Sequence, residues 1–393
     1  MRYGIASALL FFAPVVALAV PSSAPVLWSL DLPGPIYSIP KVSDGTVYLD
    51  TAQAHGPNVF AVKKGRILWR FAAGGAIPRA VTIGGEQVFV ASDVGQTHFM
   101  RAINARTGAL VWDYARREPP QCMCSHISHY AGNLLFAQTD GHSLYAFHPV
   151  GNMPDHRIWR FVGDGARLTV PAVSGDTVVF GSADHRVYGL AAGTGKILWK
   201  QSTGYSFVAG PVVWNGTAIL GNRGGTVHAY SAVTGKPLWS FSTEGPIDAP
   251  ALVWRNRVFV ASGPGDRGIY ALAAATGHLL WRARLGDYTR WAPVLDGTTL
   301  VIASRDGYLA GLSAQTGRVR WRTRLQGEPL SQPLLWQGKI VLKVNDHRIE
   351  AYDAAGGRPE WLYATRAVVT APVAGEHHLY VGTSAGKLLS FRS

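Results

Sequence analysis

The side chains with the most evident chemistry lie close together in Arg116–His129, which reads RREPPQCMCSHISH. Cys122 and Cys124 could form a disulfide in an oxidising compartment, although one intervening residue makes a strained and reducible ring. The same thiolates could instead join His126 and His129 in holding a soft metal such as Cu(I) or Zn²⁺. A redox-active pair is a third use, but it lacks the usual two-residue spacing. The sequence favours the disulfide and no metal, because a further ligand pair at zinc-site separation is missing.

A second group of polar and aromatic residues recurs at one position of a repeated pattern, two or three residues before a proline where that proline is present. Its members are Arg79, His126, Asp248, Arg290, Trp291 and Ser331. Guanidinium groups and aromatic rings bind carboxylated or planar ligands by ion pairing and stacking. Asp248 is the acid available as a general base, although no catalytic residue is predicted outright. The alternative is that these residues line a wet opening, where polar side chains cost little and bind nothing.

The composition narrows the classes of protein that could carry these residues. Lys and Arg number 37 and Asp and Glu 24, so the formal charge is 37 − 24 = +13. Because 47% of the 393 residues are hydrophobic and 16% charged, a disordered chain is excluded. The 45 glycines, and 13 tryptophans against 4 methionines, also disfavour a helical bundle. No nucleotide-binding or serine-hydrolase fingerprint stands in a strand–turn–helix context, and nucleic acid is not an expected partner.

Internal repetition determines the expected fold. A tryptophan ends a similar string nine times along the chain, at intervals of 40 to 47 residues. These residues are Trp28, Trp69, Trp112, Trp159, Trp199, Trp239, Trp281, Trp321 and Trp361. Each ring is expected to pack against the neighbouring unit, where the glycine of a Thr-Gly turn lets the two backbones approach. A structural role is therefore predicted for all nine tryptophans.

Each unit contains four strand-like runs separated by turn signals. In the fourth unit these runs are Leu168–Val173, Thr177–Gly181, Val187–Leu190 and Ile197–Gln201. Asp-Gly or a related dipeptide separates the second run from the third, and Thr-Gly separates the third from the fourth. Four short antiparallel strands in every forty or so residues are typical of a propeller blade. The sequence therefore predicts an all-β, closed β-propeller of four-stranded antiparallel blades. The polar and aromatic group described above falls where the innermost strands begin, so it is expected at the mouth of the central channel as a binding site for a ligand or partner.

The two ends of the chain predict how the ring closes. The last unit, Ala367–Phe391, contains three strands and then stops. The fourth strand, with its tryptophan, stands at the other end of the chain as Val26–Leu30. We expect this N-terminal strand to complete the last blade, because an open array would leave unpaired strand edges. Counting the units in this way predicts nine blades.

The repeated eleven-residue string, as in Ala229–Trp239 (AYSAVTGKPLW) and Ala271–Trp281 (ALAAATGHLLW), resembles the repeat of the PQQ-like (quinoprotein-type) β-propellers. The resemblance covers residues 20–393, which are expected to form a single domain. That family includes quinoprotein alcohol dehydrogenases and the scaffold lipoprotein of the outer-membrane β-barrel assembly machinery. Both typically have eight blades, so the resemblance makes eight the alternative to the count of nine.

A quinoprotein enzyme would bind PQQ with calcium, and the resemblance implies roles for four of the candidates. Trp291 would be the stacking floor, Arg79 and Arg290 would bind the cofactor carboxylates, and Asp248 would be the general base. Those dehydrogenases use adjacent cysteines and a cluster of calcium-binding oxygen ligands, and the sequence offers neither. Most blade turns are also too short to enclose a substrate. We therefore expect no cofactor, and a non-catalytic scaffold for protein partners that resembles the assembly scaffold more than the dehydrogenases. A sugar- or metal-binding propeller is a further alternative.

The N-terminus predicts the compartment. A basic start precedes the apolar run Ile5–Val20, and Ala17–Ala19 fits a small-residue cleavage site, so residues 1–19 are expected to be a signal peptide. No transmembrane segment is expected. The mature chain is expected to be a soluble monomer, periplasmic or secreted, with partners in the cell envelope. No cysteine near the cleavage site offers a point for lipid attachment.

The excess of positive charge has two interpretations. Many of the cations follow the repeat tryptophans on the expected outer strands, where charged side chains protect exposed strand edges from aggregation. Alternatively, the surface docks on something anionic, such as lipid headgroups, glycans or acidic loops of a partner.

Overall fold

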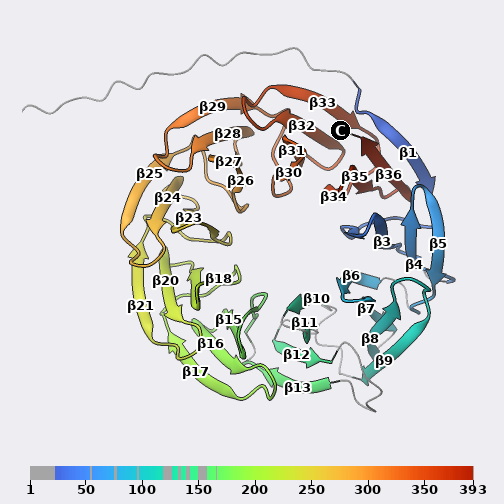
Figure 1. The fold of residues 1–393 in the computed structure, drawn as a ribbon, viewed down its shortest axis with the longest axis horizontal. Coiled ribbons are helices and arrows are strands. Elements are labelled where there is room, and N and C mark those ends of the chain that lie inside the picture. The colour runs from blue at the N-terminus through green and yellow to red at the C-terminus, as the bar shows by residue number, and fades with distance from the viewer. Residues whose placement is uncertain are drawn as a thin grey trace, which may run out of the picture.

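The computed structural model describes residues 23–53, 55–74, 78–94, 97–117, 126–131, 134–138, 142–148, 157–164 and 166–392. Over these ranges the chain contains strands and no helix, and the strands form nine four-stranded antiparallel sheets arranged as a ring (Figure 1). The count of nine blades is confirmed, and the alternative of eight is wrong, because every tryptophan-bearing strand has three strands of its own to complete a sheet. The expected signal peptide, together with Cys122 and Cys124, lies outside the described residues.

The blades are numbered here in chain order, and each runs from an innermost strand to an outermost one (Figure 1). Blades 1 to 3 comprise β2 (Lys41–Ser43), β3 (Thr46–Asp50), β4 (Val59–Lys63), β5 (Arg66–Phe71); β6 (Pro78–Gly84), β7 (Gln87–Val94), β8 (Thr97–Asn104), β9 (Leu110–Arg117); and β10 (His126–Ala131), β11 (Leu134–Gln138), β12 (Ser143–Phe147), β13 (Arg157–Val162). Blades 4 to 6 comprise β14 (Ala172–Ser174), β15 (Thr177–Gly181), β16 (Arg186–Ala191), β17 (Ile197–Ser202); β18 (Val212–Trp214), β19 (Thr217–Gly221), β20 (Thr226–Ser231), β21 (Pro237–Ser242); and β22 (Leu252–Trp254), β23 (Arg257–Ala261), β24 (Gly268–Ala273), β25 (Leu279–Arg284). Blades 7 to 9 comprise β26 (Val294–Asp296), β27 (Thr299–Ser304), β28 (Tyr308–Ser313), β29 (Val319–Arg324); β30 (Leu334–Trp336), β31 (Lys339–Lys343), β32 (Arg348–Asp353), β33 (Pro359–Ala364); and β34 (Val373–Ala374), β35 (His378–Gly382), β36 (Lys387–Arg392), β1 (Val26–Asp31).

Most of the innermost strands are short, and the prediction that such a strand begins at Leu168 is wrong. In blade 4, β14 begins at Ala172, and Leu168 meets the second strand only through an isolated bridge to Ser182. The recurring proline, here Pro171, has no N–H to donate to the ladder, so the strand starts after it.

Strand direction gives the ring two distinct faces. Because neighbouring strands are antiparallel, the turns between the first and second strands and between the third and fourth strands lie on one face, which we call the turn face. The turns between the second and third strands lie on the opposite face, together with the links from each outer strand to the next inner strand. We call this second face the connection face.

The core lies between the blades. The second and third strands carry the buried side chains, and each hydrophobic cluster joins residues of two neighbouring blades, as Phe136 and Leu144 of blade 3 pack with Phe180 of blade 4. Burying one such aromatic or aliphatic side chain contributes roughly 1.5–3 kcal/mol. The stability of each blade therefore depends on its neighbours.

The repeat tryptophans join each blade to the next. At five junctions the indole Nε1 of the outer strand donates to a carbonyl of the following blade: Trp69 to Ala105 (2.8 Å), Trp159 to Ala192 (2.6 Å), Trp199 to Ala232 (3.0 Å), Trp239 to Ala274 (2.9 Å) and Trp281 to Ala314 (3.2 Å). The Nε1 atoms of Trp321 and Trp361 are buried without a hydrogen-bond partner in the described structure. Each ring lies over the glycine of that blade's Thr-Gly turn. At Gly195, where φ is +68°, a Cβ atom would stand 2.6 Å from Cδ2 of Trp159. Only glycine accepts both this conformation and this approach.

The ring closes as expected. β1 pairs antiparallel with β36, with Val26 opposite Phe391 and Leu30 opposite Leu388 (Figure 1). Trp28 of this strand lies over Gly65, the turn glycine of blade 1, so the seam uses the same contact as the other blade junctions. The two ends of the described chain are thereby held in one sheet, and neither side of that sheet's β36 is left as a free edge.

Candidate functional site

Four side chains of the connection face form a compact cationic and aromatic cluster at blade 7. Tyr288, Arg290 and Trp291 lie in the link between β25 and β26, and Arg305 lies in the turn between β27 and β28. The Tyr288 Oη accepts a hydrogen bond from Nη1 of Arg305 at 2.9 Å and one from Nη2 of Arg290 at 3.3 Å. Hydrogen bonds from Arg290 and then Arg305 lower the pKa of Tyr288 below its ordinary value. Two guanidinium groups thus converge on one phenol.

Trp291 and Arg305 extend this cluster to the next link, between β29 and β30. The Trp291 Nε1 donates to the carbonyl of Pro329 at 3.2 Å, and Nε of Arg305 donates to Glu328 at 3.2 Å. Arg290, in contrast, is exposed and has no carboxylate partner within the described ranges. It is therefore the cation of the cluster that is available to an external anion.

Asp248 belongs to a structural pattern that recurs in three successive blades. An arginine of the turn between the second and third strands pairs with an acid of the link that follows the same blade. The pairs are Arg223–Asp248 at 3.0 Å, Arg267–Asp287 at 3.7 Å and Arg305–Glu328 at 3.2 Å. All six side chains are partly exposed, so solvent screening leaves each pair with little net effect on stability. The Asp248 carboxylate is engaged by an arginine, as its counterparts are.

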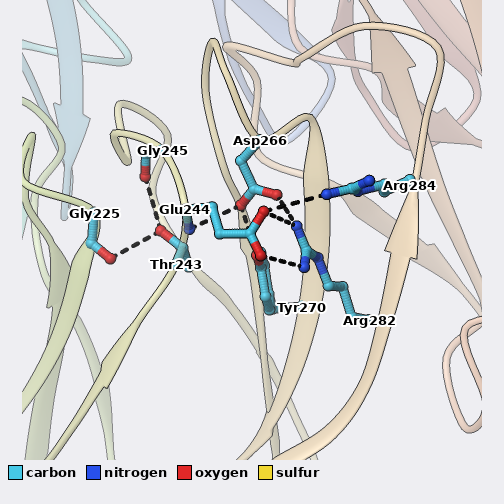
Figure 2. A network of polar contacts seen from close by, with 8 residues as sticks. All are labelled: Gly225, Thr243, Glu244, Gly245, Asp266, Tyr270, Arg282 and Arg284. Atoms are coloured by element: carbon cyan, nitrogen blue, oxygen red, sulfur yellow. Dashed lines mark hydrogen bonds and ion pairs between the residues drawn. The ribbon is translucent and has the colours of Figure 1, made fainter.

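A larger polar network stands where blade 5 passes to blade 6 (Figure 2). Arg282 donates to both carboxylate oxygens of Glu244 at 2.7 Å and also contacts Asp266, while Arg284 reaches Glu244 at 3.2 Å. The Asp266 side chain is fully buried and accepts a hydrogen bond from Tyr270 at 2.6 Å. Burial opposes ionisation of Asp266, but the Tyr270 and Arg282 hydrogen bonds hold its pKa below the ordinary value. Both acids are thus neutralised internally.

The acids of this region do not provide a calcium site. Calcium takes six to eight oxygen ligands, usually from several carboxylates. Asp248, Glu244 and Asp266 each accept from an arginine, and no group of three or more His, Cys, Asp or Glu side chains that could hold a metal is found among the described residues. The donor set around Asp248 and Trp291 therefore does not fit the calcium that accompanies PQQ.

A cavity opens on the connection face between blades 4 and 5. It has a volume of about 300 Å³, and its lining includes the apolar side chains of Phe207 and Val208 and the guanidinium groups of Arg167 and Arg223. Arg223 is paired with Asp248, whereas no carboxylate of the described chain pairs with Arg167. The cavity combines an apolar surface with positive charge.

The other residues predicted for a binding, disulfide or metal site lie in different parts of the structure. Ser331 is buried, and its Oγ accepts the Lys343 N–H at 2.9 Å, as Thr169 and Thr370 accept the N–H of Gly181 and Gly382 at 3.0 Å. These hydroxyls satisfy backbone groups beyond the end of the short inner strand. Arg79 lies in β6 and His126 and His129 in β10, but their side chains are outside the described part of the structure, as are Cys122 and Cys124.

Exposed apolar side chains also mark the connection face. Those on the links between blades include Tyr37, Ile39, Val170, Tyr205, Val208, Leu330 and Val368. Tyr37 and Tyr205 are the most exposed of these, at 62% and 57%. Tyrosine, tryptophan and arginine are the side chains that most often carry binding energy in protein interfaces.

Sequence reasoning found Arg290 and Trp291 but missed Tyr288, Arg305 and Glu328. Arg305 stands next to Asp306-Gly307, a dipeptide that by itself indicates only a hairpin turn. The available signal was topological: the turn between the second and third strands lies on the same face as the inter-blade links. The residues that precede the recurring proline lie in the links alone, so their pattern does not include the facing turns.

A buried acid in blade 1 gives the protein a pH-dependent stability. Asp50, 3% exposed, ends β3 and accepts a hydrogen bond from Ser38. Burial raises its pKa to about 6, against about 3.9 in an unfolded chain. The folded protein binds the Asp50 proton more tightly than the unfolded chain does. The stabilisation that this proton binding gives is therefore fully present below about pH 4 and is lost as the pH rises through about 6. Over that window it amounts to roughly 3 kcal/mol.

Asp50→Asn should remove this pH-dependent loss of stability. We therefore expect the difference in unfolding free energy, variant minus wild type, to be roughly 3 kcal/mol larger at about pH 8 than at about pH 4. Urea unfolding at both values measures the difference. His228 works in the opposite direction, because burial lowers its pKa to about 4 and its contribution is lost as the pH falls from about 6.5. His228→Gln is the control, and an Asp50→Asn effect that did not change with pH would contradict the assignment.

A known protein family and solved protein structures are similar to this chain. The family model described as "Outer membrane protein assembly factor BamB" matches residues 15–152, 126–206, 183–287 and 265–393. The crystal structure of BamB from Moraxella catarrhalis is similar to this chain with a TM-score of 0.59 and 17% identity, covering 94% of this chain and 100% of that one. The computationally designed Ika8 protein is similar with a TM-score of 0.61 and 18% identity, at the same coverage. At these identities the likeness shows the fold. No curated protein sequence matches the chain.

The described residues contain no helix that is long and apolar enough to cross a membrane.

Proposed function

Because the chain belongs to the family described as outer membrane protein assembly factor BamB, we propose that it is a non-catalytic propeller of the cell envelope that binds other proteins. It acts in the periplasm after loss of the N-terminal signal, as a monomer, and contributes to the assembly of envelope proteins. It needs no cofactor. The connection face is the binding surface.

One observation supports the connection face as the binding surface. Arg290 is exposed beside Tyr288, Trp291 and Arg305, and it lacks an internal carboxylate partner in the described structure. Arginine and aromatic side chains in one cluster are the common anchors of protein interfaces. The arginines around the cluster orient it toward an acidic segment of the partner, since an unpaired guanidinium binds a carboxylate bidentately.

We expect Arg290→Glu to weaken partner binding by at least tenfold, because it replaces an anchoring cation by a charge that repels an acidic segment. Affinity capture from an envelope extract identifies the partner by mass spectrometry, and titration with that purified partner gives the dissociation constants. Lys200→Glu is the matched control, since it makes the same charge change on an exposed outer strand. Equal affinities for Arg290→Glu and the wild type would refute the connection face as the binding surface.

The absence of catalysis is tested separately. The protein is incubated with PQQ and Ca²⁺ and assayed for dye-linked oxidation of alcohols and glucose, and we expect no turnover above the buffer control. Turnover that was lost in Asp248→Asn or Trp291→Ala would instead establish a quinoprotein enzyme and overturn the proposal.

A further inference from the structure

The turn face carries a ring of basic and histidine side chains at equivalent positions. In six blades the glycine of the turn between the third and fourth strands is followed at once by a basic or histidine side chain. These residues are Arg66, Lys196, Lys236, His278, Arg318 and Arg358, and all are exposed. Among the described turns of this type, one acidic side chain is present, that of Asp353. Its carboxylate accepts a hydrogen bond from the Gly356 N–H at 2.7 Å. These turns therefore carry an excess of positive charge, and the exposed acid beside them in blade 4 is Asp176, in the turn between β14 and β15.

Large aliphatic side chains stand exposed close to these residues, most of them at the start of the outer strands. Blades 4, 5 and 6 show this most fully. Their exposed aliphatic residues are Ile197, Leu198, Val233, Leu238, Leu279 and Leu280. Leu198 is 53% exposed and Val233, in the turn itself, 59%. We call these six residues, with Lys196, Lys236 and His278, the basic rim.

Contacts between the blades make the basic rim continuous. Trp199 follows Leu198 directly, lies over Gly235 and donates to the carbonyl of Ala232. The aliphatic pair of blade 4 is thereby held next to the turn that carries Val233 and Lys236. Trp239 holds blade 5 against the turn of blade 6 in the same way. One rigid scaffold thus presents three copies of a lysine or histidine with neighbouring aliphatic side chains.

The pattern of ion pairs separates the two faces. On the connection face, acids pair with cations across successive blades, as in Arg223–Asp248 and Arg305–Glu328. On the turn face, the described ion pair is Lys339–Glu360, and Lys196 and Lys236 of the basic rim have no carboxylate partner in the described structure. Unpaired cations that recur along one edge favour an anionic partner.

We propose that the basic rim docks the propeller on the surface of an anionic lipid bilayer. Peripheral attachment of this kind needs apolar area to enter the headgroup region and Lys or Arg side chains to meet anionic lipids, and both are present here. Lysine is depleted in protein–protein interfaces and aromatic residues are enriched, whereas the basic rim exposes lysine and aliphatic side chains without an exposed aromatic ring. The repeated, non-directional pattern suits a laterally uniform surface, and the connection face stays turned toward protein partners.

The test is sedimentation of the purified full-length mature protein with vesicles. We expect binding to vesicles of phosphatidylethanolamine and phosphatidylglycerol, weakening as salt rises, and little binding to phosphatidylcholine vesicles. Lys196→Glu with Lys236→Glu should lower the partition coefficient roughly twentyfold or more, since each cation near an anionic surface contributes about a fivefold factor. Leu198→Ser with Leu238→Ser should lower it roughly tenfold through lost apolar insertion.

Arg290→Glu is the control, because it makes the same kind of charge change on the connection face and should leave vesicle binding unchanged. All affected side chains are exposed, and unfolding curves verify that each variant is folded. Failure of the wild type to sediment with anionic vesicles, or equal binding by the lysine variant, overturns the proposal. If the lysine variant instead lost a protein partner while vesicles were never bound, the basic rim would be a protein interface and the lipid proposal would be wrong. Either outcome can be distinguished from failure of the proposed protein binding by the connection face, because among these variants only Arg290→Glu is expected to weaken that binding.

Discussion

Gly195→Ala is expected to lower the free energy of unfolding by about 3 to 5 kcal/mol. Two costs combine at this turn. The left-handed conformation, with φ of +68°, costs roughly 1–2 kcal/mol for a residue with a side chain. The added Cβ would also stand 2.6 Å from Cδ2 of Trp159, so the ring must move, at an overpacking cost of roughly 1–3 kcal/mol. Movement of the ring further weakens the 2.6 Å hydrogen bond from Trp159 to Ala192.

Gly175→Ala in the same blade is the matched control. Gly175 has a φ of +54°, and nothing lies within 4 Å of the position its Cβ would take. This variant should show the backbone cost alone, roughly 1–2 kcal/mol. Urea unfolding followed by tryptophan fluorescence measures both. If the two substitutions cost the same, the tryptophan contact between blades contributes nothing beyond backbone strain, and the account of blade docking given above would be wrong.

Phe391→Ala is expected to destabilise the protein by about 3–5 kcal/mol and to loosen the closing strand. Phe391 is fully buried in β36, opposite Val26 of β1. Its ring stacks on Trp361 of blade 8 at a centroid distance of 5.5 Å and meets Tyr363 edge-on at 5.4 Å. Truncation therefore removes the aromatic contact between blades 8 and 9 at the sheet where the two ends of the chain join, and leaves a cavity there.

Unfolding free energy and the rate of proteolysis near the N-terminus report the two effects of Phe391→Ala. Val26→Ala is the control, because Val26 pairs with the same residue but is 43% exposed, so its truncation should cost well under 1.5 kcal/mol. A strand β1 that became no more sensitive to protease in Phe391→Ala would show that closure does not depend on this packing.

The fold could be predicted from the sequence because each unit carries its own local signals. Trp199 and Gly195 recur as equivalents in other units, turn glycines separate the strands, and strand-forming runs lie between them. The unpaired strand around Trp28 and the three-strand last unit predicted both the closure and the count of nine, against the eight blades typical of the resembled family. The start of the inner strands was less predictable, because it depends on where Pro171 and its equivalents interrupt the ladder.

The candidate site was predictable only in part. Arg290 and Trp291 stood out by type and position, but their neighbour Arg305 comes from a different strand turn. The sequence offers Asp248 as an alternative general base because its partner Arg223, 25 residues earlier, cannot be identified from spacing. The burial of Asp50 was equally invisible, since an acid at the end of a strand normally faces water.

The sequence by itself determined the number of blades, their strand order, the closing strand and the positions of the docking tryptophans. These depend on contacts within a unit or with the next unit, and such contacts repeat in the sequence at a constant period. Only the tertiary structure decided which charges are neutralised and which are left free. Ion pairs such as Arg282–Glu244 and the cluster of Tyr288 with Arg290 and Arg305 depend on side chains that different strands bring to one face of the ring. Charge pairing falls off within a few ångströms, so it follows spatial distance, which the order of residues along the chain does not contain.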